Sequence, residues 1–268
     1  MQVAPSTYYA VKTRRPSSRR RRDAEPKREV SRVHRDNFRV YGAEKIWRQL
    51  LREGIVVGRD RVARLTHDLG LAGAVCGKKV RTTVPSDIGV RPPDLVDGAF
   101  RAPAPDRLSV ADLTYVSTWS GFAYTAFIVD AFSRAIVGWR VATSLRAELA
   151  LGALEMAIWA RRPTAADALV HHSDRGVQYL AIRYRERLAD EGAVTSVGSR
   201  GDSYDNALAE TVMGLYKTEL IRLRGPWRTA EQVELATASW VDWWNRRRLH
   251  SAASNLPPAE FEKLYHDQ

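Results

Sequence analysis

HHSDRGVQY (His171–Tyr179) and DNALAETVMGLYK (Asp205–Lys217) are the two stretches that decide the fold and the chemistry of this chain. The first places Asp174 directly after a short apolar run that is typical of a buried strand. The second places Glu210 one turn inside a predicted helix, and 35 residues, 175 to 209, separate the two acids. Open α/β sheets hold functional groups just beyond the carboxyl ends of their strands, so Asp174 is a candidate site residue.

A third carboxylate, Asp112, lies upstream in the strand-like run LSVADLTYV (Leu108–Val116). A charge in the middle of an apolar strand is costly unless a metal ion or an ionic partner compensates it. Phosphoryl transfer assisted by two metal ions needs hard oxygen ligands that hold the ions roughly 3.5–4 Å apart. Asp112, Asp174 and Glu210 together therefore predict a divalent-metal site for phosphoryl transfer on DNA. Each acid alone has an ordinary alternative, because backbone donors or a nearby cation also satisfy a carboxylate.

The third ligand has competitors, because other acids lie near Glu210 in the sequence, namely Asp202, Asp205 and Glu219. Asp205 and Asn206 are typical helix-start residues that cap the first turn. Lys217 follows Glu210 by seven residues, close to two helical turns, and Asn206 precedes Glu210 by four. One helix face is therefore predicted to present an amide, a metal-binding carboxylate and a phosphate-binding ammonium group.

The positive charge of the chain is concentrated in its N-terminal part. The 268 residues carry a formal net charge of +11. Residues 1–105 hold 23 Lys and Arg against 11 Asp and Glu, whereas residues 106–268 hold 19 against 20. Such asymmetry favours a polyanionic partner, most often nucleic acid, over a merely solvated basic tail.

Cysteine usage and hydropathy indicate the compartment. The chain has one cysteine, Cys76, which excludes an internal disulfide framework and is typical of a reduced compartment. No apolar run is long enough to span a membrane, and no apolar segment follows the N-terminal basic residues. We therefore expect a cytoplasmic, nucleoid-associated protein.

Composition and periodicity divide the chain into five expected segments. These are a flexible or loosely helical basic arm (1–35), a helix-turn-helix-like DNA-binding module (36–73), a linker (74–107), a catalytic core (108–226) and a C-terminal helical segment (227–268).

The module at 36–73 is predicted from two short amphipathic helices. GAEKIWRQLLREG (Gly42–Gly54) and the following stretch to Gly73 each place apolar residues on one helical face. A tight glycine-containing turn between two helices is typical of a helix-turn-helix, and three arginines are placed for DNA contact at the start of the second helix, Arg59, Arg61 and Arg64. A plain helical hairpin packed on the main domain is the alternative.

The core is predicted to be an α/β domain with a mixed sheet flanked by helices. Three strand-like runs come first, followed by alternating helix and strand and two closing helices. Their expected ranges are strands at 108–117, 122–130, 135–142, 168–172 and 193–197, and helices at 146–160, 179–191, 206–221 and 229–245.

At these residues the chain resembles a known family. The matching pieces are VADLTYV around Asp112, FIVDAFSRAIVGWR, HHSDRGVQY, SYDNALAET around Glu210, GLYKTELI through Lys217, WVDWWNRRRLHSA and LPPAEF near the end, and the upstream YGAEKIW. Together they resemble the second-frame (OrfB-type) transposases of bacterial insertion sequences, which have the retroviral-integrase catalytic core.

The resemblance implies a ribonuclease-H-like fold, two Mg²⁺ (or Mn²⁺) ions and no covalent enzyme–DNA intermediate. Water first frees a 3′-hydroxyl at the element's end, and that hydroxyl then attacks another phosphodiester. By position, Asp112, Asp174 and Glu210 would be the catalytic metal ligands, and Lys217 would hold the terminal phosphate. The full set of expected DNA contacts is Lys217, Asn206, Arg175, Arg59, Arg61, Arg64, Arg246 and Arg247.

The expected partners are the insertion-sequence ends and target DNA. Strand transfer holds two DNA ends together, so we expect a homo-oligomer in the active complex. In this family an upstream-frame protein often supplies end recognition. The chain begins with its own Met and lacks a sustained heptad repeat, so it resembles the second frame alone. A DNA-binding regulator or remnant with a catalytically idle core is the alternative function.

One residue departs from the family pattern. The family usually has Trp at the position of Ser109, close to Asp112. Losing a buried aromatic ring there is expected to cost a few kcal/mol of packing, so the departure bears on stability more than on chemistry. A Ser109→Trp substitution is therefore expected to change thermal stability.

Overall fold

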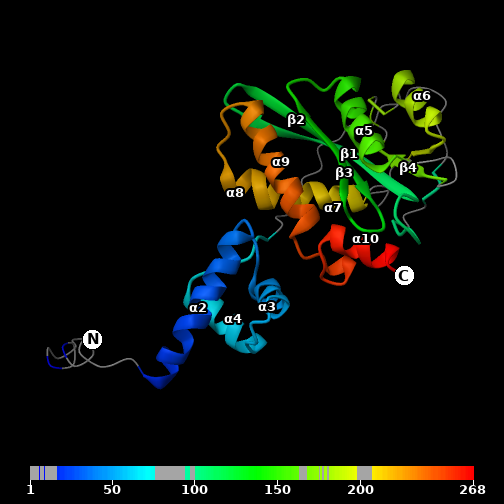
Figure 1. Ribbon diagram of the computed structural model, residues 1–268. Helices are drawn as coiled ribbons and strands as arrows, with labels where there is room; N and C mark the ends of the chain where they lie inside the picture. The colour runs from blue at the N-terminus through cyan, green and yellow to red at the C-terminus, as the bar shows by residue number, and fades with distance from the viewer. Residues whose placement is uncertain are drawn as a thin grey trace. The chain divides into compact units, whose positions relative to one another are not determined.

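The computed structural model describes residues 6, 9, 17–75, 94–96, 100–162, 168–174, 176, 178–179, 181–197 and 207–268. The chain divides into two compact units, Met1–Ala74 and Val75–Gln268 (Figure 1). Among the described residues, no helix has both the length and the apolar character that a membrane crossing requires.

The N-terminal unit is a group of three helices, α2 (Ser18–Asp36), α3 (Ala43–Arg52) and α4 (Arg59–Asp68). The last two occupy the ranges predicted for the helical hairpin. The difference lies in α2, because most of the expected loose basic arm is a packed helix whose Val30 and Val33 are fully buried. Apolar periodicity did not predict this helix, since its sequence is dominated by arginine and other polar residues.

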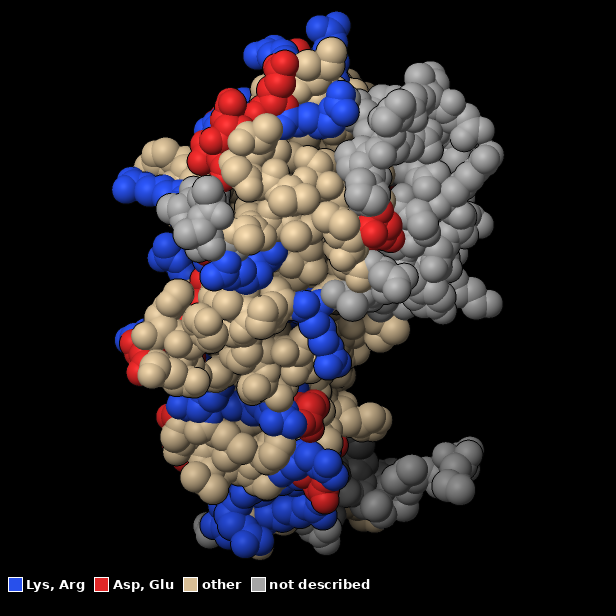
Figure 2. All heavy atoms as spheres, turned by 90° about the vertical axis from the view of Figure 1, so that its right-hand side faces the viewer, with Lys and Arg blue, Asp and Glu red and all other residues tan. Residues whose placement is uncertain are grey.

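Asp23 explains how so basic a helix packs. Its side chain is 5% exposed and accepts hydrogen bonds from Arg64 Nη2 at 2.8 Å and Arg61 Nε at 2.9 Å, both on α4. The hydrogen bond from Arg64 and then that from Arg61 lower the pKa of Asp23. On the face drawn in Figure 2, blue Lys and Arg side chains gather toward the lower end of the view, with acidic side chains between them.

The described part of the second unit forms a five-stranded mixed sheet in the order β3-β2-β1-β4-β5. The strands are β1 (Leu108–Thr118), β2 (Gly121–Asp130), β3 (Ile136–Ala142), β4 (Val170–Ser173) and β5 (Val194–Val197). The pairs β1/β2 and β2/β3 are antiparallel, whereas β1/β4 and β4/β5 are parallel. The predicted mixed-sheet α/β fold is confirmed.

The register of β4 creates an opening in the middle of the sheet. β4 pairs with Leu108–Ala111, and its last residue, Ser173, lies opposite Ala111. From Asp112 onward β1 has left its parallel neighbour, while β2 continues to pair with β1 as far as Thr118. A long strand beside a short one therefore exposes the edge of β1 where the carboxyl end of β4 lies.

Helices cover both faces of the sheet. On one face α5 (Ala147–Arg161) and α6 (Ile182–Asp190) enclose an apolar core with Ala111, Ala126 and Ile128. On the other face Phe127 packs against α7 (Ala207–Tyr216) and α9 (Ala230–Arg246), and its ring centre lies 5.0 Å from that of Tyr216. Alternation along β1 and β2 directs neighbouring residues into these two layers.

The C-terminal residues are part of this core. α7 continues through a π-helical turn (Lys217–Ile221, η2) into the short α8 (Arg222–Arg224), and a 3₁₀ turn (Ser251–Ala253) leads to α10 (Pro258–His266). Trp244 of α9 donates its indole N–H to the Arg134 carbonyl at 2.8 Å. Glu262 of α10 accepts two hydrogen bonds from Arg161, at 2.6 and 2.9 Å. Residues 227–268, expected to be a C-terminal helical segment, contain the helices α9 and α10, and these pack against the sheet and α5.

Candidate active site

Asp112 and Asp174 meet at the opening beside β1. Each follows a residue of the paired register Ala111–Ser173, so parallel pairing carries both carboxylates to the same edge. The Leu113 N–H donates to Asp112 Oδ1 at 2.7 Å, and the Gly176 N–H donates to Asp174 Oδ1 at 2.9 Å. Local backbone donors thus fix the orientation of both side chains.

The surroundings of Asp112 and Asp174 disfavour the ionised form of both carboxyl groups. Burial raises the pKa of Asp112 to about 8, and the neighbouring charges of Asp174 and Glu210 add to that rise. Burial likewise raises the pKa of Asp174, against the Gly176 hydrogen bond and His172. Two carboxylates that lie close together and away from water repel each other, so both favour the protonated form. A bound cation would favour the ionised form instead.

α7 brings Glu210 and Lys217 to the same edge. Glu210 is exposed in the first turn of α7, and its charge acts on Asp112. Lys217 begins the π-helical turn, and its charge lowers the pKa of Asp112. Burial in turn lowers the pKa of Lys217, with Asp112 opposing that effect. Asp112 therefore lies within electrostatic reach of the other two expected ligands and of the expected phosphate anchor.

The donor set suits a hard divalent cation. Carboxylate oxygens are the ligands that Mg²⁺ prefers, and the mutual repulsion of these acids favours positive charge between them. In the described ranges, no three His, Cys, Asp or Glu side chains lie close enough together to hold a metal ion. Asp112 is nevertheless close enough to Asp174 and Glu210 for the charges of both to raise its pKa.

Glu219, a competitor for the third ligand position, is engaged elsewhere. Its carboxylate is buried at 3% exposure and accepts hydrogen bonds from Arg248 Nη2 at 2.6 Å and Arg248 Nε at 3.0 Å. The Arg248 guanidinium also lies 4.5 Å from the centre of the Trp244 ring. The other expected residues near this point fall outside the described residues, namely Asp202, Asp205, Asn206 and Arg175.

The two histidines before Asp174 point into the protein. His171 bonds through Nδ1 to Ser109 Oγ and through Nε2 to the Tyr184 hydroxyl, each at 2.8 Å. Burial lowers the pKa of His171 to about 3, so the ring is neutral. His172 bonds through Nδ1 to Ser196 Oγ at 2.9 Å. These bonds tie β4 to β1, α6 and β5, and so fix the strand that leads into Asp174.

Tyr179 is a site residue that sequence reasoning missed. Its side chain is 2% exposed, and its hydroxyl is one of the few buried polar atoms in the described ranges that lack a hydrogen-bond partner. Burial raises its pKa well above the usual value, and the charges of Asp174 and Asp112 add to that rise. Its position in the HHSDRGVQY stretch was the available signal.

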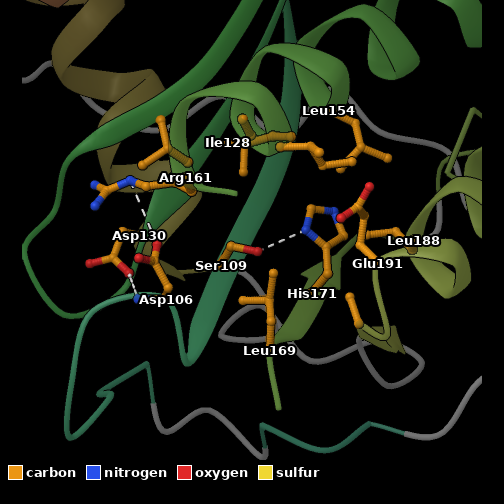
Figure 3. Close-up of a pocket in the computed structure, with 14 residues that line it drawn as sticks. Asp106, Ser109, Ile128, Asp130, Leu154, Arg161, Leu169, His171, Leu188 and Glu191 are labelled. Atoms are coloured by element: carbon orange, nitrogen blue, oxygen red, sulfur yellow. Dashed lines mark hydrogen bonds and ion pairs between the residues drawn. The ribbon is translucent and has the colours of Figure 1, made fainter. Parts of the chain in front are cut away.

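Ser109 lines a small cavity behind the site (Figure 3). The cavity has a volume of ≈ 30 Å³, and most of its wall is apolar, including Ile128, Leu154 and Leu188. Figure 3 shows the Ser109 hydroxyl pointing to the His171 ring across one side of it. The volume is about that of one water molecule in the liquid, much smaller than an indole. The hydrogen bond to His171 satisfies the buried Ser109 hydroxyl, so Ser109 is integrated into this core.

The expected DNA-binding arginines differ in their surroundings. Arg61 and Arg64 are held by Asp23 within the N-terminal unit, whereas Arg59 is exposed at the start of α4 beside Asp60. In the second unit two exposed arginines close α9, Arg246, which pairs with Asp242 at 3.2 Å, and Arg247.

Comparison with protein-family models identifies both units. A model described as an integrase core domain matches residues 102–203, and a second of that description matches residues 191–258. A model described as an HTH-like domain matches residues 20–79. The HTH-like match includes nearly all of α2, and the second integrase match includes α9.

The chain is also similar to whole transposases. The chain is 55% identical over 271 residues to the transposase assigned to insertion sequence element IS986/IS6110 of Mycobacterium tuberculosis, covering 100% of this chain and 98% of that protein. It is 52% identical to the transposase for IS629 of Shigella sonnei, covering 99% and 90%. Among solved structures, a chain of the simian T-cell lymphotropic virus intasome in complex with PP2A regulatory subunit B56 gamma has a similar fold. The TM-score is 0.52 and the sequence identity is 13%, and the match covers 87% of this chain and 74% of that one.

Proposed function

Because this chain belongs to the insertion-sequence transposases that carry an integrase core domain, and so to the polynucleotidyl transferases, we propose that it cuts the DNA ends of its element and joins the freed 3′-hydroxyl to target DNA. The observation that carries this proposal is the meeting of Asp112 and Asp174 at the open edge of β1, with Glu210 and Lys217 in electrostatic reach.

The proposed cofactor is Mg²⁺ or Mn²⁺, as two ions. Asp112 and Asp174 would hold them, and Glu210 would complete the ligand set from α7. Bound there, the ions would supply Lewis-acid activation of the attacking oxygen and charge stabilisation of the leaving oxygen. The raised pKa of Asp112 supports this assignment, since a buried carboxylate beside other acids is otherwise unfavourable.

The chain's own residues position the DNA. The Lys217 ammonium would bind a phosphate oxygen next to the reacting phosphodiester, within reach of Asp112. In the first step a water oxygen forms the new bond to phosphorus and the bond to the 3′-oxygen breaks, which leaves a 3′-hydroxyl and a 5′-phosphate. In the second step that 3′-hydroxyl attacks a target phosphodiester and displaces the target's own 3′-oxygen. Neither step leaves DNA covalently attached to the protein.

The partners follow from the reaction. Two element ends have to be held at once, so the active complex would contain at least two copies of the chain, joined by the upstream-frame protein where that protein supplies end recognition. The HTH-like unit would bind DNA outside the cut, with Arg59 better placed than Arg61 and Arg64 because Asp23 occupies the other two. Arg246 and Arg247 would follow the phosphates near the core. With DNA as substrate, the protein would act at the nucleoid.

An end-cleavage assay tests the proposal. The full chain, with its upstream-frame protein where required, is incubated with labelled element-end DNA and Mn²⁺. Changing residues around metal ligands typically costs 10–100-fold, so Asp174→Asn and Glu210→Gln are expected to reduce nicking by more than about 100-fold. Glu148→Gln, at an exposed acid on α5, is the matched control and should cut like the wild type.

A second readout does not depend on cleavage. Mn²⁺ should raise the thermal midpoint of the wild type but not that of Asp112→Asn, because binding to the folded state alone stabilises it. Equal nicking by the wild type and Glu210→Gln would rule out Glu210 as the third ligand. Binding of element ends with no cleavage under any of these conditions would instead identify a DNA-binding protein with an idle core.

A further inference from the structure

We propose that the tip of the β1–β2 hairpin and the segment after α7 form a binding strip for unpaired DNA nucleotides. We call it the aromatic–basic strip, and it consists of Tyr115, Trp119, Phe122, Lys217 and Arg228. The inference rests on the proposed function, since it assigns a single-stranded stretch of the DNA substrate to the surface beside the carboxylates. Unpaired bases stack on aromatic rings, and their phosphates bind lysine and arginine.

Three aromatic rings of the hairpin are exposed. The exposed fractions are 70% for Trp119, 53% for Phe122 and 44% for Tyr115. The rings of Tyr115 and Phe122 meet edge to face with their centres 5.6 Å apart, so they form one continuous surface. Clustered apolar rings in water are unfavourable and mark binding surfaces.

Cations alternate with these rings. Lys217 Nζ lies 5.0 Å from the centre of the Tyr115 ring, and the guanidinium carbon of Arg228 lies 5.4 Å from that of Trp119. Each cation approaches a ring while remaining on the surface, where it can also meet a phosphate. Rings flanked by positive charge are the arrangement that binds single-stranded nucleic acid without sequence preference.

The sign of the surrounding charge excludes a cationic ligand. The segment from 217 to 228 has four basic residues, Lys217, Arg222, Arg224 and Arg228, and one acid, Glu219. Because Glu219 is buried and paired with Arg248, the exposed charges of the segment are all positive. Residues 113–129, which include the hairpin, contain no Asp or Glu. The strip therefore suits a polyanion.

The strip is held rigid before any ligand binds. The Trp119 N–H donates to the Trp227 carbonyl at 3.0 Å, and the Ser120 N–H donates to the Arg228 carbonyl at 3.1 Å. The Trp227 indole N–H donates to the Ile221 carbonyl at 2.9 Å. In Figure 1 the loop between α8 and α9 accordingly lies beside the turn between β1 and β2. A preorganised surface loses less conformational entropy when it binds.

The strip begins close to the carboxylates. A strand rises ~3.3 Å per residue, so Tyr115 lies about 10 Å from Asp112 along β1. Alternation puts the Asp112 and Tyr115 side chains on opposite faces, but at the open edge Lys217 reaches both. A strand whose phosphate binds Lys217 can thus continue along the rings toward Trp119.

Fluorescence anisotropy with a labelled oligothymidylate of about twelve nucleotides tests the strip. The full chain is used without divalent metal, so that binding is separated from cleavage. Trp119→Ala and Phe122→Ala are each expected to raise the dissociation constant by about 5- to 100-fold, the usual effect of removing one stacking partner. Trp119→Phe should bind close to the wild type. Thermal melting verifies that each variant is folded.

The matched control is Trp159→Ala, which removes an equally exposed tryptophan (75%) from α5 and should leave binding unchanged. Oligonucleotide carrying 5-iododeoxyuridine should photocrosslink to Tyr115, Trp119 or Phe122. Wild-type affinity in Trp119→Ala, crosslinks confined to other segments, or loss of self-association with unchanged oligonucleotide binding would each overturn the strip.

These outcomes are separable from the cleavage assay. A wild-type chain that fails to cut DNA but binds oligothymidylate through Trp119 supports the strip and contradicts the proposed function. A chain that cuts DNA normally, with Trp119→Ala binding and cutting like the wild type, contradicts the strip and leaves the proposed function standing.

Discussion

Asp112 and Glu219, two carboxylates on neighbouring elements, have opposite environments. Glu219 is 3% exposed and receives two hydrogen bonds from Arg248, which itself packs on Trp244. Asp112 accepts one backbone N–H from Leu113 and lies within the fields of Asp174 and Glu210. Arg248 neutralises Glu219, whereas burial and the neighbouring acids disfavour the ionised form of Asp112.

This difference separates a structural acid from a functional one. A buried ion pair with good geometry holds α7, η2 and α9 together and has nothing left to offer a ligand. Acids that lie together and away from water disfavour one another's ionisation until a cation binds between them, and their backbone hydrogen bonds keep them oriented meanwhile. Four predictions test this contrast, in order of decreasing effect.

The largest expected effect is on the paired region. Arg248→Ala leaves the Glu219 carboxylate buried without its cation and should lower the free energy of unfolding by about 3–5 kcal/mol. Urea unfolding measures the change. The double variant Glu219→Leu/Arg248→Met is the control and should recover most of the loss. A loss below about 1 kcal/mol would mean that the pair is not buried as the structure has it.

Substitution of Asp112, which lies among other acids, should change the free energy of unfolding in the opposite direction. Asp112→Asn removes a carboxyl group that is ionised in the unfolded chain but has to be protonated, at a cost, in the folded one. The variant should therefore raise the free energy of unfolding by roughly 1–3 kcal/mol at neutral pH without divalent metal, while cleavage is lost. The folded pKa of about 8 exceeds the ordinary 3.8, so the wild type loses stability relative to the variant as pH rises through that window. Unfolding curves across the window measure this loss, and a destabilised Asn variant would contradict it.

The third prediction concerns Ser109, whose hydroxyl is hydrogen-bonded to His171 inside the apolar core. Because the adjacent cavity is only ≈ 30 Å³ and the hydroxyl bonds His171, Ser109→Trp should lower the free energy of unfolding by about 1–3 kcal/mol through overpacking. The structure thus predicts that Ser109→Trp lowers stability, whereas the sequence predicted a change in stability without a direction. Thermal melting distinguishes the outcomes, and Ser109→Ala serves as the small-residue control. A higher melting temperature for the Trp variant would show that the core can open for an indole.

The smallest effect concerns His171. Its folded pKa of about 3 lies below the ordinary 6.5, so its contribution to stability is present above pH 6.5 and is lost as pH falls toward 3. Between pH 6.5 and 5.5 the loss should be about 1 kcal/mol. His171→Gln should flatten the pH dependence of unfolding over this interval. An unchanged slope would show that His171 is not the group responsible.

Much of the fold was predictable because its periodicity is local. The predicted strands and helices of the core match β1 to β5 and α5 to α9 with small shifts at their ends, because alternating and helical patterns are written into short stretches. α2 escaped prediction because Asp23 depends on Arg61 and Arg64, which are remote in sequence. α10 was not predicted because Glu262, which holds this helix in place, contacts Arg161 and Ser133 only in the folded chain.

The sequence by itself determined the residue types and spacing of the candidate site, Asp112, Asp174, Glu210 and Lys217, and hence the family and the fold. Only the tertiary structure decided which carboxylate is paired with a buried arginine and which lies among other acids. The parallel register of β4 brings Asp174 beside Asp112, and Arg248 removes Glu219 from the competition. The physical reason is that a carboxylate's role depends on the charges and donors around it, which come from segments far apart in the chain.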